Sequence, residues 1–204
     1  MRNFKYSRIL AILALLAAFA LTACIGGSGP SEPTRYYTLA LEDINMPSAS
    51  GENAPRVQIR KFTVEAAYQR ANIVYRESAY DFMFYDLDLW ASRPEVMLTQ
   101  LVTAYVDKSS LFKPAEAKPT VKPDYEILGN VNAIEEVDEG SNRYARLALT
   151  LTFRKTEAET LWEGRFDEKV AMNGSEPRHV AEAASKLLAK YMEDALSNIA
   201  NVSK

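Results

Sequence analysis

The sequence predicts an α+β fold, in which two amphipathic helices pack on one face of a mainly antiparallel sheet. Two patterns carry this prediction. Between residues 124 and 172, apolar side chains recur at every second position, which is typical of strands with one buried face. Apolar side chains recur at helical spacing in two further stretches, one after Pro94 and one after Pro177. Helices flanked by strands of this kind favour a layer of helices on one side of the sheet.

Residues 1–23 have the pattern of a secretory signal peptide. Arg2, Lys5 and Arg8 precede an apolar run from Ile9 to Leu21, and small residues follow that run. As a helix, residues 9–22 would reach about 21 Å, which is short of the roughly 30 Å of hydrocarbon in a bilayer. We therefore expect this segment to be removed from the mature chain.

Cys24 is the predicted lipidation site. The run Leu21-Thr22-Ala23-Cys24 resembles the lipobox of bacterial lipoproteins, in which the cysteine becomes the first residue and carries acyl groups such as palmitate. Cys24 is also the only cysteine, so no disulfide framework, metal cluster or redox pair can be built from thiols. The alternative is an ordinary signal peptide with an incidental cysteine.

Acylation would anchor the protein without a transmembrane helix, because several lipid chains hold a protein stably at a membrane. Ile25 follows the cysteine where inner-membrane lipoproteins of the enteric type typically carry aspartate, so we expect the outer membrane of a Gram-negative cell, facing the periplasm. Residues 24–34 are rich in Gly, Ser and Pro. We interpret them as a flexible tether with a reach of roughly 18 Å.

Residues 35–204 suit a single domain, and their composition argues against several partners. The whole chain has 24 Lys and Arg against 27 Asp and Glu, and its formal net charge is −3. Such a chain lacks the basic footprint of a nucleic-acid-binding protein, and only the lipid anchor is expected to reach the membrane. A hydrophobic content of 48% excludes wholesale disorder.

The first half of this domain predicts short strands and one helix. Alternation predicts strands over residues 35–41, 56–60, 72–76 and 80–85, the last with Tyr80 and two phenylalanines on one face. Ser92 is the expected N-cap of the helix, with Glu95 completing a capping box. The helical pattern fades near residues 108–112, ahead of a proline-bearing loop at residues 114–123.

The second half predicts a three-stranded meander followed by a long helix. The strand over residues 143–154 alternates most clearly, and Gly129 in the strand before it is the expected position of a bulge. A turn over residues 173–177 opens the terminal helix, whose apolar stripe consists of Val180, Ala184, Leu187, Leu188, Tyr191, Ala195 and Ile199.

Catalytic patterns are missing from the sequence. His179 is the only histidine, which removes most hydrolase arrangements and any site with several histidines, and we interpret it as a surface residue. Asp86 and Asp88 would share one side of a strand, but two carboxylates do not make a metal site, so a solvated strand end is the favoured interpretation. The sequence predicts no enzyme, no cofactor and no metal.

Several short motifs, taken in order, resemble the ABC-type transport auxiliary lipoproteins, the family that contains paraquat-inducible protein C. They are the lipobox, Tyr36-Tyr37-Thr38-Leu39 after the tether, Ala71-Asn72-Ile73-Val74-Tyr75-Arg76, and Trp90-Ala91 leading through Pro94 into a helix. The similarity covers essentially the whole mature chain. The acidic run 86–89 and the long tether depart from the family pattern, which bears on contact details.

The resemblance implies a non-enzymatic accessory subunit of a lipid transporter that supports the cell envelope. Its partners would be an ABC permease and an MCE-domain protein, and the contact candidates carried over are Tyr37, Arg76, Tyr80 and Trp90. Core packing remains the alternative for Tyr37 and Trp90. An adaptor for outer-membrane assembly, a periplasmic lipid-binding carrier and a homo-oligomer all stay open.

Overall fold

The computed structural model describes residues 32–46, 54–116 and 119–203. The chain divides into two compact units, Met1–Pro33 and Thr34–Lys204, and the description below concerns the second. The predictions for the signal peptide, Cys24 and most of the tether lie outside the described residues. Within them, no helix is both long and apolar enough to cross a membrane.

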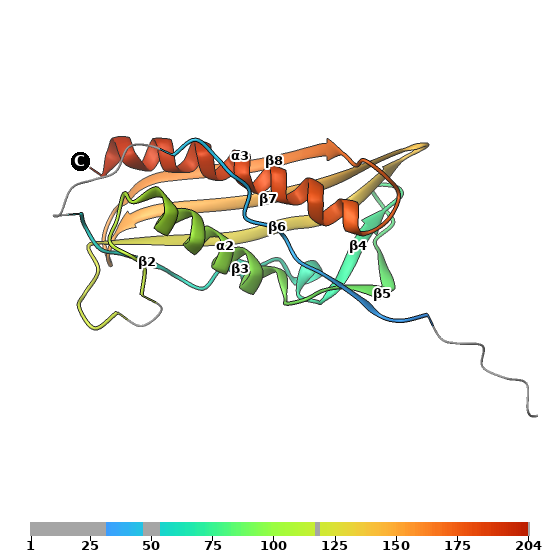
Figure 1. The fold of residues 1–204 in the computed structure, drawn as a ribbon, viewed down its shortest axis with the longest axis horizontal. Coiled ribbons are helices and arrows are strands. Elements are labelled where there is room, and N and C mark those ends of the chain that lie inside the picture. The colour runs from blue at the N-terminus through green and yellow to red at the C-terminus, as the bar shows by residue number, and fades with distance from the viewer. Residues whose placement is uncertain (1–31, 47–53, 117–118, 204) are drawn as a thin grey trace, which may run out of the picture. The chain divides into compact units, whose positions relative to one another are not determined.

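The second unit is an α+β fold with a mixed sheet, and both long helices cover the same face of that sheet (Figure 1). The predicted fold class is therefore confirmed. The strand order is β1-β5-β4-β6-β7-β8, and β2 and β3 also pair with β6. The bounds are β1 Arg35–Tyr37, β2 Val57–Ile59, β3 Thr63–Val64, β4 Asn72–Arg76, β5 Met83–Trp90, β6 Tyr125–Glu139, β7 Asn142–Lys155 and β8 Thr160–Ala171, with helices η1 Ala66–Tyr68, α2 Pro94–Ser109 and α3 Arg178–Val202.

The predicted meander is confirmed as β6, β7 and β8, which are long and antiparallel. Gly140 turns β6 into β7 with a φ of +64°, a conformation that glycine adopts without steric cost. The face toward the helices is apolar because side chains alternate along each strand. On β7 its fully buried members are Ala145, Leu147, Leu149, Leu151 and Phe153.

Strand β6 is paired along both of its edges. One edge carries β7 over its whole length, and the other carries β2, β3 and β4 one after another, all parallel to β6. Beyond β4 the sheet continues with β5, which is antiparallel to β4, and β1, which is parallel to β5. Residues from the first half of the chain thus lie beside β6 rather than forming a separate sheet.

Helix α3 buries the whole predicted apolar stripe. Its Tyr191 also reaches into the sheet, where the hydroxyl donates to the carbonyl of Leu147 at 2.8 Å and accepts from the N–H of Glu168 at 2.9 Å. Leu147 on β7 and Glu168 on β8 are cross-strand partners. The hydroxyl therefore bridges two backbone groups of neighbouring strands, and it fixes the helix to the β7–β8 pair.

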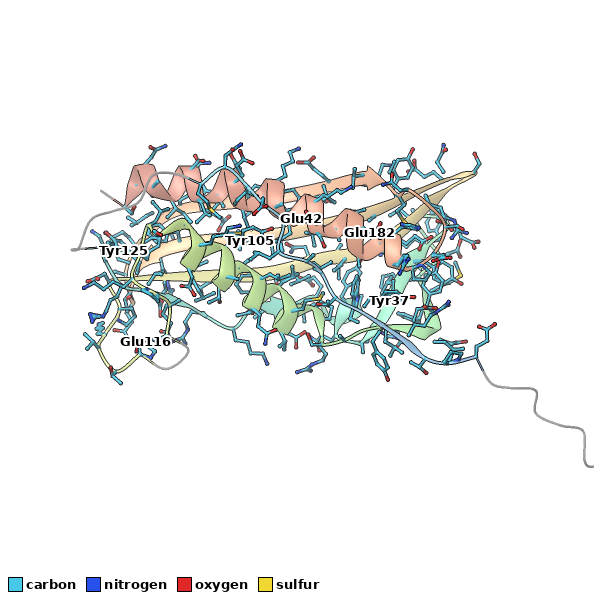
Figure 2. The ribbon with its side chains drawn as sticks, in the orientation of Figure 1. Tyr37, Glu42, Tyr105, Glu116, Tyr125 and Glu182 are labelled. Atoms are coloured by element: carbon cyan, nitrogen blue, oxygen red, sulfur yellow. The ribbon has the colours of Figure 1, made fainter. Side chains whose placement is uncertain are left out.

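The first predicted strand, residues 35–41, is wrong in its extent, because β1 ends at residue 37. Beyond it, residues 38–46 run between α2 and α3, and their backbone donates to side chains of both helices. The N–H of Ala40 donates to Ser185 Oγ at 2.9 Å, and that of Glu42 to the Tyr105 hydroxyl at 3.0 Å (Figure 2). Leu41, the last residue of the predicted strand, is 43% exposed.

Two further local predictions are wrong. Helix α2 has Arg93 at its N-cap without a side-chain cap, and Glu95 is buried beside Arg93 (Nε to Oε1, 3.1 Å) instead of completing a capping box. The irregularity in β6 falls between residues 131 and 133 and not at Gly129. At Gly129 a Cβ atom would lie 2.4 Å from the ring of Phe62, so the glycine makes room for that ring.

The Tyr191 bridge gives a first testable prediction. Tyr191→Phe keeps the ring, which stacks on Phe166, but removes the hydroxyl from two buried backbone partners. We expect the free energy of unfolding, measured by urea titration, to fall by about 1–3 kcal/mol. Tyr80→Phe is the control and should leave it unchanged, because Tyr80 is 96% exposed. If Tyr191→Phe were as stable as Tyr80→Phe, the N–H of Glu168 and the carbonyl of Leu147 would have to bond each other directly once the hydroxyl is removed.

Candidate functional site

The single histidine is engaged locally. His179 lies in the first turn of α3, with its Nδ1 2.9 Å from Glu182 Oε2 on the next turn. Across the described residues, no group of three or more His, Cys, Asp or Glu side chains is placed to hold a metal ion. The chemistry of this unit therefore rests on its carboxylates, arginines and aromatic residues.

Asp88 is buried and not solvated, so that part of the sequence interpretation of residues 86–88 is wrong. Because β1 runs parallel to β5 with Arg35 beside Asp88, the guanidinium meets the carboxylate with two bonds of 2.8 and 3.1 Å. The Tyr37 hydroxyl donates to the same carboxylate at 2.8 Å. Burial, and next the hydrogen bond to Asp88, raise the pKa of Tyr37. Asp86 is exposed.

Glu135 of β6 is a fully buried carboxylate on the sheet face that lies away from the helices. Its Oε2 accepts from the Tyr68 hydroxyl at 2.6 Å and from Arg76 Nε at 2.7 Å. Its Oε1 accepts from Arg146 at 2.7 Å, and Arg146 also forms two bonds of 2.8 Å to Asp167. Burial raises the pKa of Tyr68, since it disfavours the phenolate, and the neighbouring Glu135 raises it further.

Aromatic rings adjoin this carboxylate. Phe82 meets Tyr68 edge to face with ring centroids 5.5 Å apart, and it meets Phe84 in the same way at 5.4 Å. The guanidinium of Arg76 lies 4.7 Å from the Phe82 centroid, and that of Arg70 lies 3.7 Å from the Phe84 centroid. Phe82 and Phe84 are thus held by rings and cations of the same unit, which is how partly buried aromatic residues are satisfied.

Glu136, the next residue along β6, is fully buried on the opposite face. It accepts from the Tyr85 hydroxyl and from Arg143, both at 3.0 Å. Burial raises the pKa of Glu136 to about 7; the nearby Asp138 also raises it, while Tyr85 and Arg143 lower it. Arg143 in addition donates to the backbone carbonyl of Ser175 at 2.9 Å, so the same cluster holds the segment that leads into α3.

The turn between β4 and β5 presents a fully exposed tyrosine. Ser78 organises the turn, since its hydroxyl donates to Asp81 at 2.6 Å and accepts from the N–H of Tyr80 at 3.1 Å. Tyr80 is 96% exposed. A strand was predicted to begin at Tyr80, but β5 begins only at Met83, because the chain first completes this turn.

The structure separates the four contact candidates into two pairs. Tyr37 and Trp90 are cross-strand partners at the β1–β5 edge, and Trp90 is only 2% exposed. Arg76 ends β4 and Tyr80 follows it in the β4–β5 turn. The second pair therefore places a cation and an exposed aromatic ring at one end of the sheet, whereas Trp90 packs in the core.

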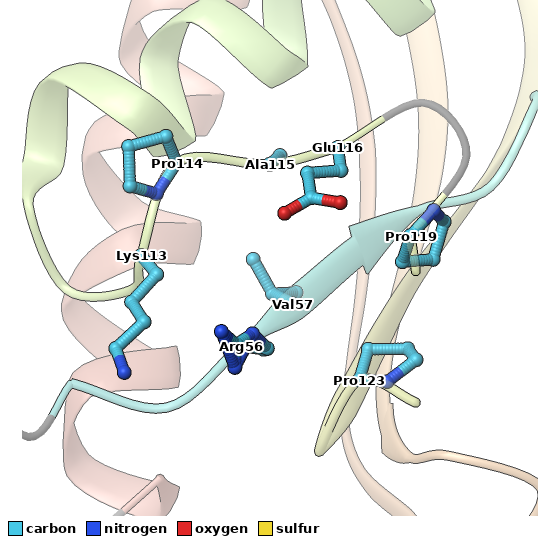
Figure 3. A pocket seen from close by; sticks show the side chains of 8 residues that line it. All are labelled: Arg56, Val57, Lys113, Pro114, Ala115, Glu116, Pro119 and Pro123. Atoms are coloured by element: carbon cyan, nitrogen blue, oxygen red, sulfur yellow. The ribbon is translucent and has the colours of Figure 1, made fainter. Parts of the chain in front are cut away.

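Between the sheet and the helices, the described part of the chain places fully buried side chains such as Leu98, Val102 and Leu188. The pocket in Figure 3 has a volume of about 350 Å³ and lies between β2 and the loop after α2. It is lined by Arg56, Val57, Lys113, Pro114, Ala115, Glu116, Pro119 and Pro123.

Sequence comparison places the chain in a family. The family described as "ABC-type transport auxiliary lipoprotein component" matches residues 37–195, and the chain belongs to this family of auxiliary lipoproteins of transport systems. The predicted family, which includes paraquat-inducible protein C, is thereby confirmed. No curated protein matches the chain.

Three solved structures share the fold. Protein XCC0632 from Xanthomonas campestris has a TM-score of 0.66 at 14% identity, with 83% of this chain and 96% of that chain covered. An uncharacterised protein has a TM-score of 0.63 at 14% identity, with 85% and 100% covered. The hypothetical protein CT253 from Chlamydia trachomatis has a TM-score of 0.50 at 6% identity, with 72% and 96% covered.

The two fully buried carboxylates of β6 were not anticipated from the sequence. One signal for them existed: Glu135 and Glu136 stand between Ile134 and Val137, and the next strand carries Arg143 and Arg146 across the hairpin. Cross-strand pairs of opposite charge are a recognised stabilising pattern. The pattern predicts pairing but not burial, because burial depends on β4 and η1, which lie far away in sequence.

Glu136 generates a prediction about pH. Its folded pKa of about 7 exceeds the ordinary value of 4.5, so between these values the folded chain binds more protons than the unfolded chain. The free energy of unfolding therefore falls as pH rises through this window, by an order of 2–3 kcal/mol from this group. We expect Glu136→Gln to flatten that dependence in urea titrations between about pH 5 and about pH 8.

The control for this experiment is Asp86→Asn, which changes an exposed carboxylate of the same sheet and should keep the wild-type dependence. A Glu136→Gln variant that loses as much stability with rising pH as the wild type would assign the effect to other groups.

Proposed function

We propose that this protein is an acylated accessory subunit of a lipid transporter that pairs an ABC permease with an MCE-domain protein. In this proposal residues 1–23 are the signal peptide, Cys24 carries the lipid, and residues 24–34 tether a non-enzymatic domain formed by residues 35–204. The anchor holds the protein at the outer membrane of a Gram-negative cell, with the domain facing the periplasm.

The family match over residues 37–195 carries the proposal, because an auxiliary component of a transport system acts by association with that system. The domain itself supports a binding role. Its buried charged groups are largely engaged with one another: Asp88 with Arg35, Glu135 with Arg76 and Arg146, and Glu136 with Arg143. Internal pairing of this kind holds a rigid body and leaves these groups poorly placed for proton transfer to a substrate.

Tyr80 is the residue that we propose for partner contact. Exposed tyrosines are frequent anchors at protein interfaces, since the ring buries much area at a low cost in conformational entropy. The hydrogen bonds of Ser78 hold the turn in which Tyr80 stands exposed, and Arg76 packs on Phe82 beside that turn. Arg76 is engaged with Glu135, so its proposed part is to position this end of the sheet.

Capture experiments test the contact. The full chain, purified in detergent with a tag, should bind an MCE-domain protein, and Tyr80→Ala should weaken binding by about 2 kcal/mol, roughly 30-fold in Kd, with an unchanged Tm. Trp90→Ala should instead lose about 3–5 kcal/mol of stability, because it empties a buried site. Tyr36→Ala is the matched control, since Tyr36 is a second exposed tyrosine, on β1.

Recovery of a β-barrel protein alone would favour the outer-membrane assembly adaptor. Recovery of phospholipid without any protein partner would favour the lipid carrier. If Tyr36→Ala and Tyr80→Ala reduce capture equally, the turn is not the specific contact.

The anchor generates a separate prediction. Cys24→Ser should abolish acylation, because serine offers no thiol for the lipid, and the product should be unprocessed or soluble in the periplasm. Intact mass measurement and membrane fractionation check this result. An unmodified Cys24 in the wild-type protein, or a wild-type protein in the soluble fraction, would refute the anchor.

A further inference from the structure

Strand β8 is an open edge of the sheet. Among the described residues it pairs only with β7, and β7 covers one of its two edges. The pairing is regular from Trp162 to Ala171, and this stretch contains no proline. Natural edge strands are usually blunted by prolines, bulges, very short length or charged side chains. This stretch of β8 has only the last of these, so the order of its charges decides which strand can pair with it.

The hydrogen bonds identify which backbone groups face outward. The N–H of Met172 donates to the carbonyl of Arg143 on β7, and the N–H of Glu168 points to Leu147 through the Tyr191 hydroxyl. Backbone direction alternates along a strand, so the even-numbered residues from 162 to 172 face β7. The backbone groups of Glu163, Arg165, Asp167 and Lys169 therefore point to the open edge.

The side chains of the same four residues alternate in charge. All four are exposed on the sheet face away from the helices, in the order acid, base, acid, base. A strand with this pattern is complementary to its own reverse, because reading it backwards exchanges every sign. An antiparallel copy of β8 would thus place an opposite charge opposite each of the four residues.

We propose that β8 is a self-association edge, which pairs antiparallel with β8 of a second copy of this chain around a two-fold axis at Phe166. Glu163 then faces Lys169 of the other copy, and Arg165 faces Asp167. These are hydrogen-bonded positions in both copies, as the outward direction of their backbone groups requires. The edge-to-edge pair joins two sheets into one continuous sheet.

Charge selects this register over its neighbours. Shifting the axis by one residue, to Arg165 or to Asp167, places like charges opposite each other at every charged pair along the strand. Like charges directly opposite in a sheet are destabilising. Moving the axis to Gly164 or Glu168 keeps only one complementary combination within β8. Of the two remaining charges, one then faces Leu161 or Ala171, and the other faces residue 159 or 173, which lies beyond the end of the strand.

The position of α3 sets how close the helices of two paired copies would come. Tyr191 reaches the gap between β7 and β8, so the axis of α3 lies inward of the open edge. In the paired sheet the two α3 helices would be about two strand spacings apart, roughly 10 Å, which is a normal distance between packed helices.

The present partners of the four side chains are exposed ion pairs. Glu163 bonds Arg165 within the strand at 3.0 Å, Lys169 pairs with Glu139, and Asp167 pairs with Arg146. Exposed pairs of this kind are weak. The pairs of Glu163 and Lys169 can therefore be exchanged for contacts with a second copy.

Cysteine crosslinking tests the register in the full chain, in membranes or detergent. In the proposed pair, positions 163 and 169 of different copies have Cα atoms about 5.5 Å apart, which suits a disulfide. Within one chain they are roughly 20 Å apart along the strand. We expect Glu163→Cys/Lys169→Cys to give a disulfide-linked dimer and each single variant to give no link, which also controls for links through Cys24.

A charge exchange tests the same contact by affinity. Glu163→Lys alone and Lys169→Glu alone each create two like-charge contacts across the axis, and we expect each to weaken association at least 10-fold in sedimentation experiments. Glu163→Lys/Lys169→Glu restores opposite charges and should recover association. All three variants change exposed residues, so an unchanged Tm shows that folding is intact.

Three results would overturn the proposal. They are a wild-type chain that is monomeric at every concentration, an oligomer indifferent to both single charge changes, and crosslinks that form equally in the single-cysteine variants or to a different protein. Binding of an MCE-domain protein through Tyr80 is measured separately, so failure of either proposal leaves the other standing.

Discussion

The fold depends on the burial of one carboxylate. Glu135 lies at the centre of the sheet, where an unpaired charge would be strongly destabilising, and three groups from three different elements satisfy it. Tyr68 comes from η1, Arg76 from β4 and Arg146 from β7, and Arg146 continues to Asp167 on β8. The first half of the chain is therefore favoured to dock in one register on the meander, because any other register deprives this carboxylate of Tyr68 and Arg76.

This arrangement also bears on function. A unit whose buried charges are neutralised internally offers neighbours a rigid body with distinct outer features: an exposed tyrosine at the β4–β5 turn and an open, charge-alternating strand at the opposite edge of the sheet. Rigid presentation reduces the entropy lost on association. The chain belongs to a family of auxiliary transport lipoproteins, and these outer features suit the partner contacts that we propose for it.

The periodicity of apolar residues predicted the fold correctly in segments whose structure depends mainly on their own sequence. The meander and α3 follow from alternation and helical spacing, because their buried faces are continuous in sequence. Prediction failed where the structure of a segment depends on a distant partner. The backbone of residues 38–42 donates to Ser185 and Tyr105 of the two helices, and Asp88 is paired with Arg35 across the parallel strands β1 and β5. Two of the contact candidates, Tyr80 and Trp90, are aromatic residues of one segment, and the sequence does not distinguish them. In the structure, Tyr80 is exposed in the β4–β5 turn, whereas Trp90 is buried where β5 pairs with β1.

The row of short strands beside β6 has a consequence for how the chain acquires its structure. β2, β3 and β4 each pair with residues more than sixty positions later in sequence. Contacts of such high sequence separation form slowly, and a chain made from its N-terminus presents these strands before their partner exists. The meander with α3 is by contrast assembled from near neighbours. We therefore expect the short N-terminal strands to pair with β6 only after the C-terminal half, which is synthesised last, has formed its sheet.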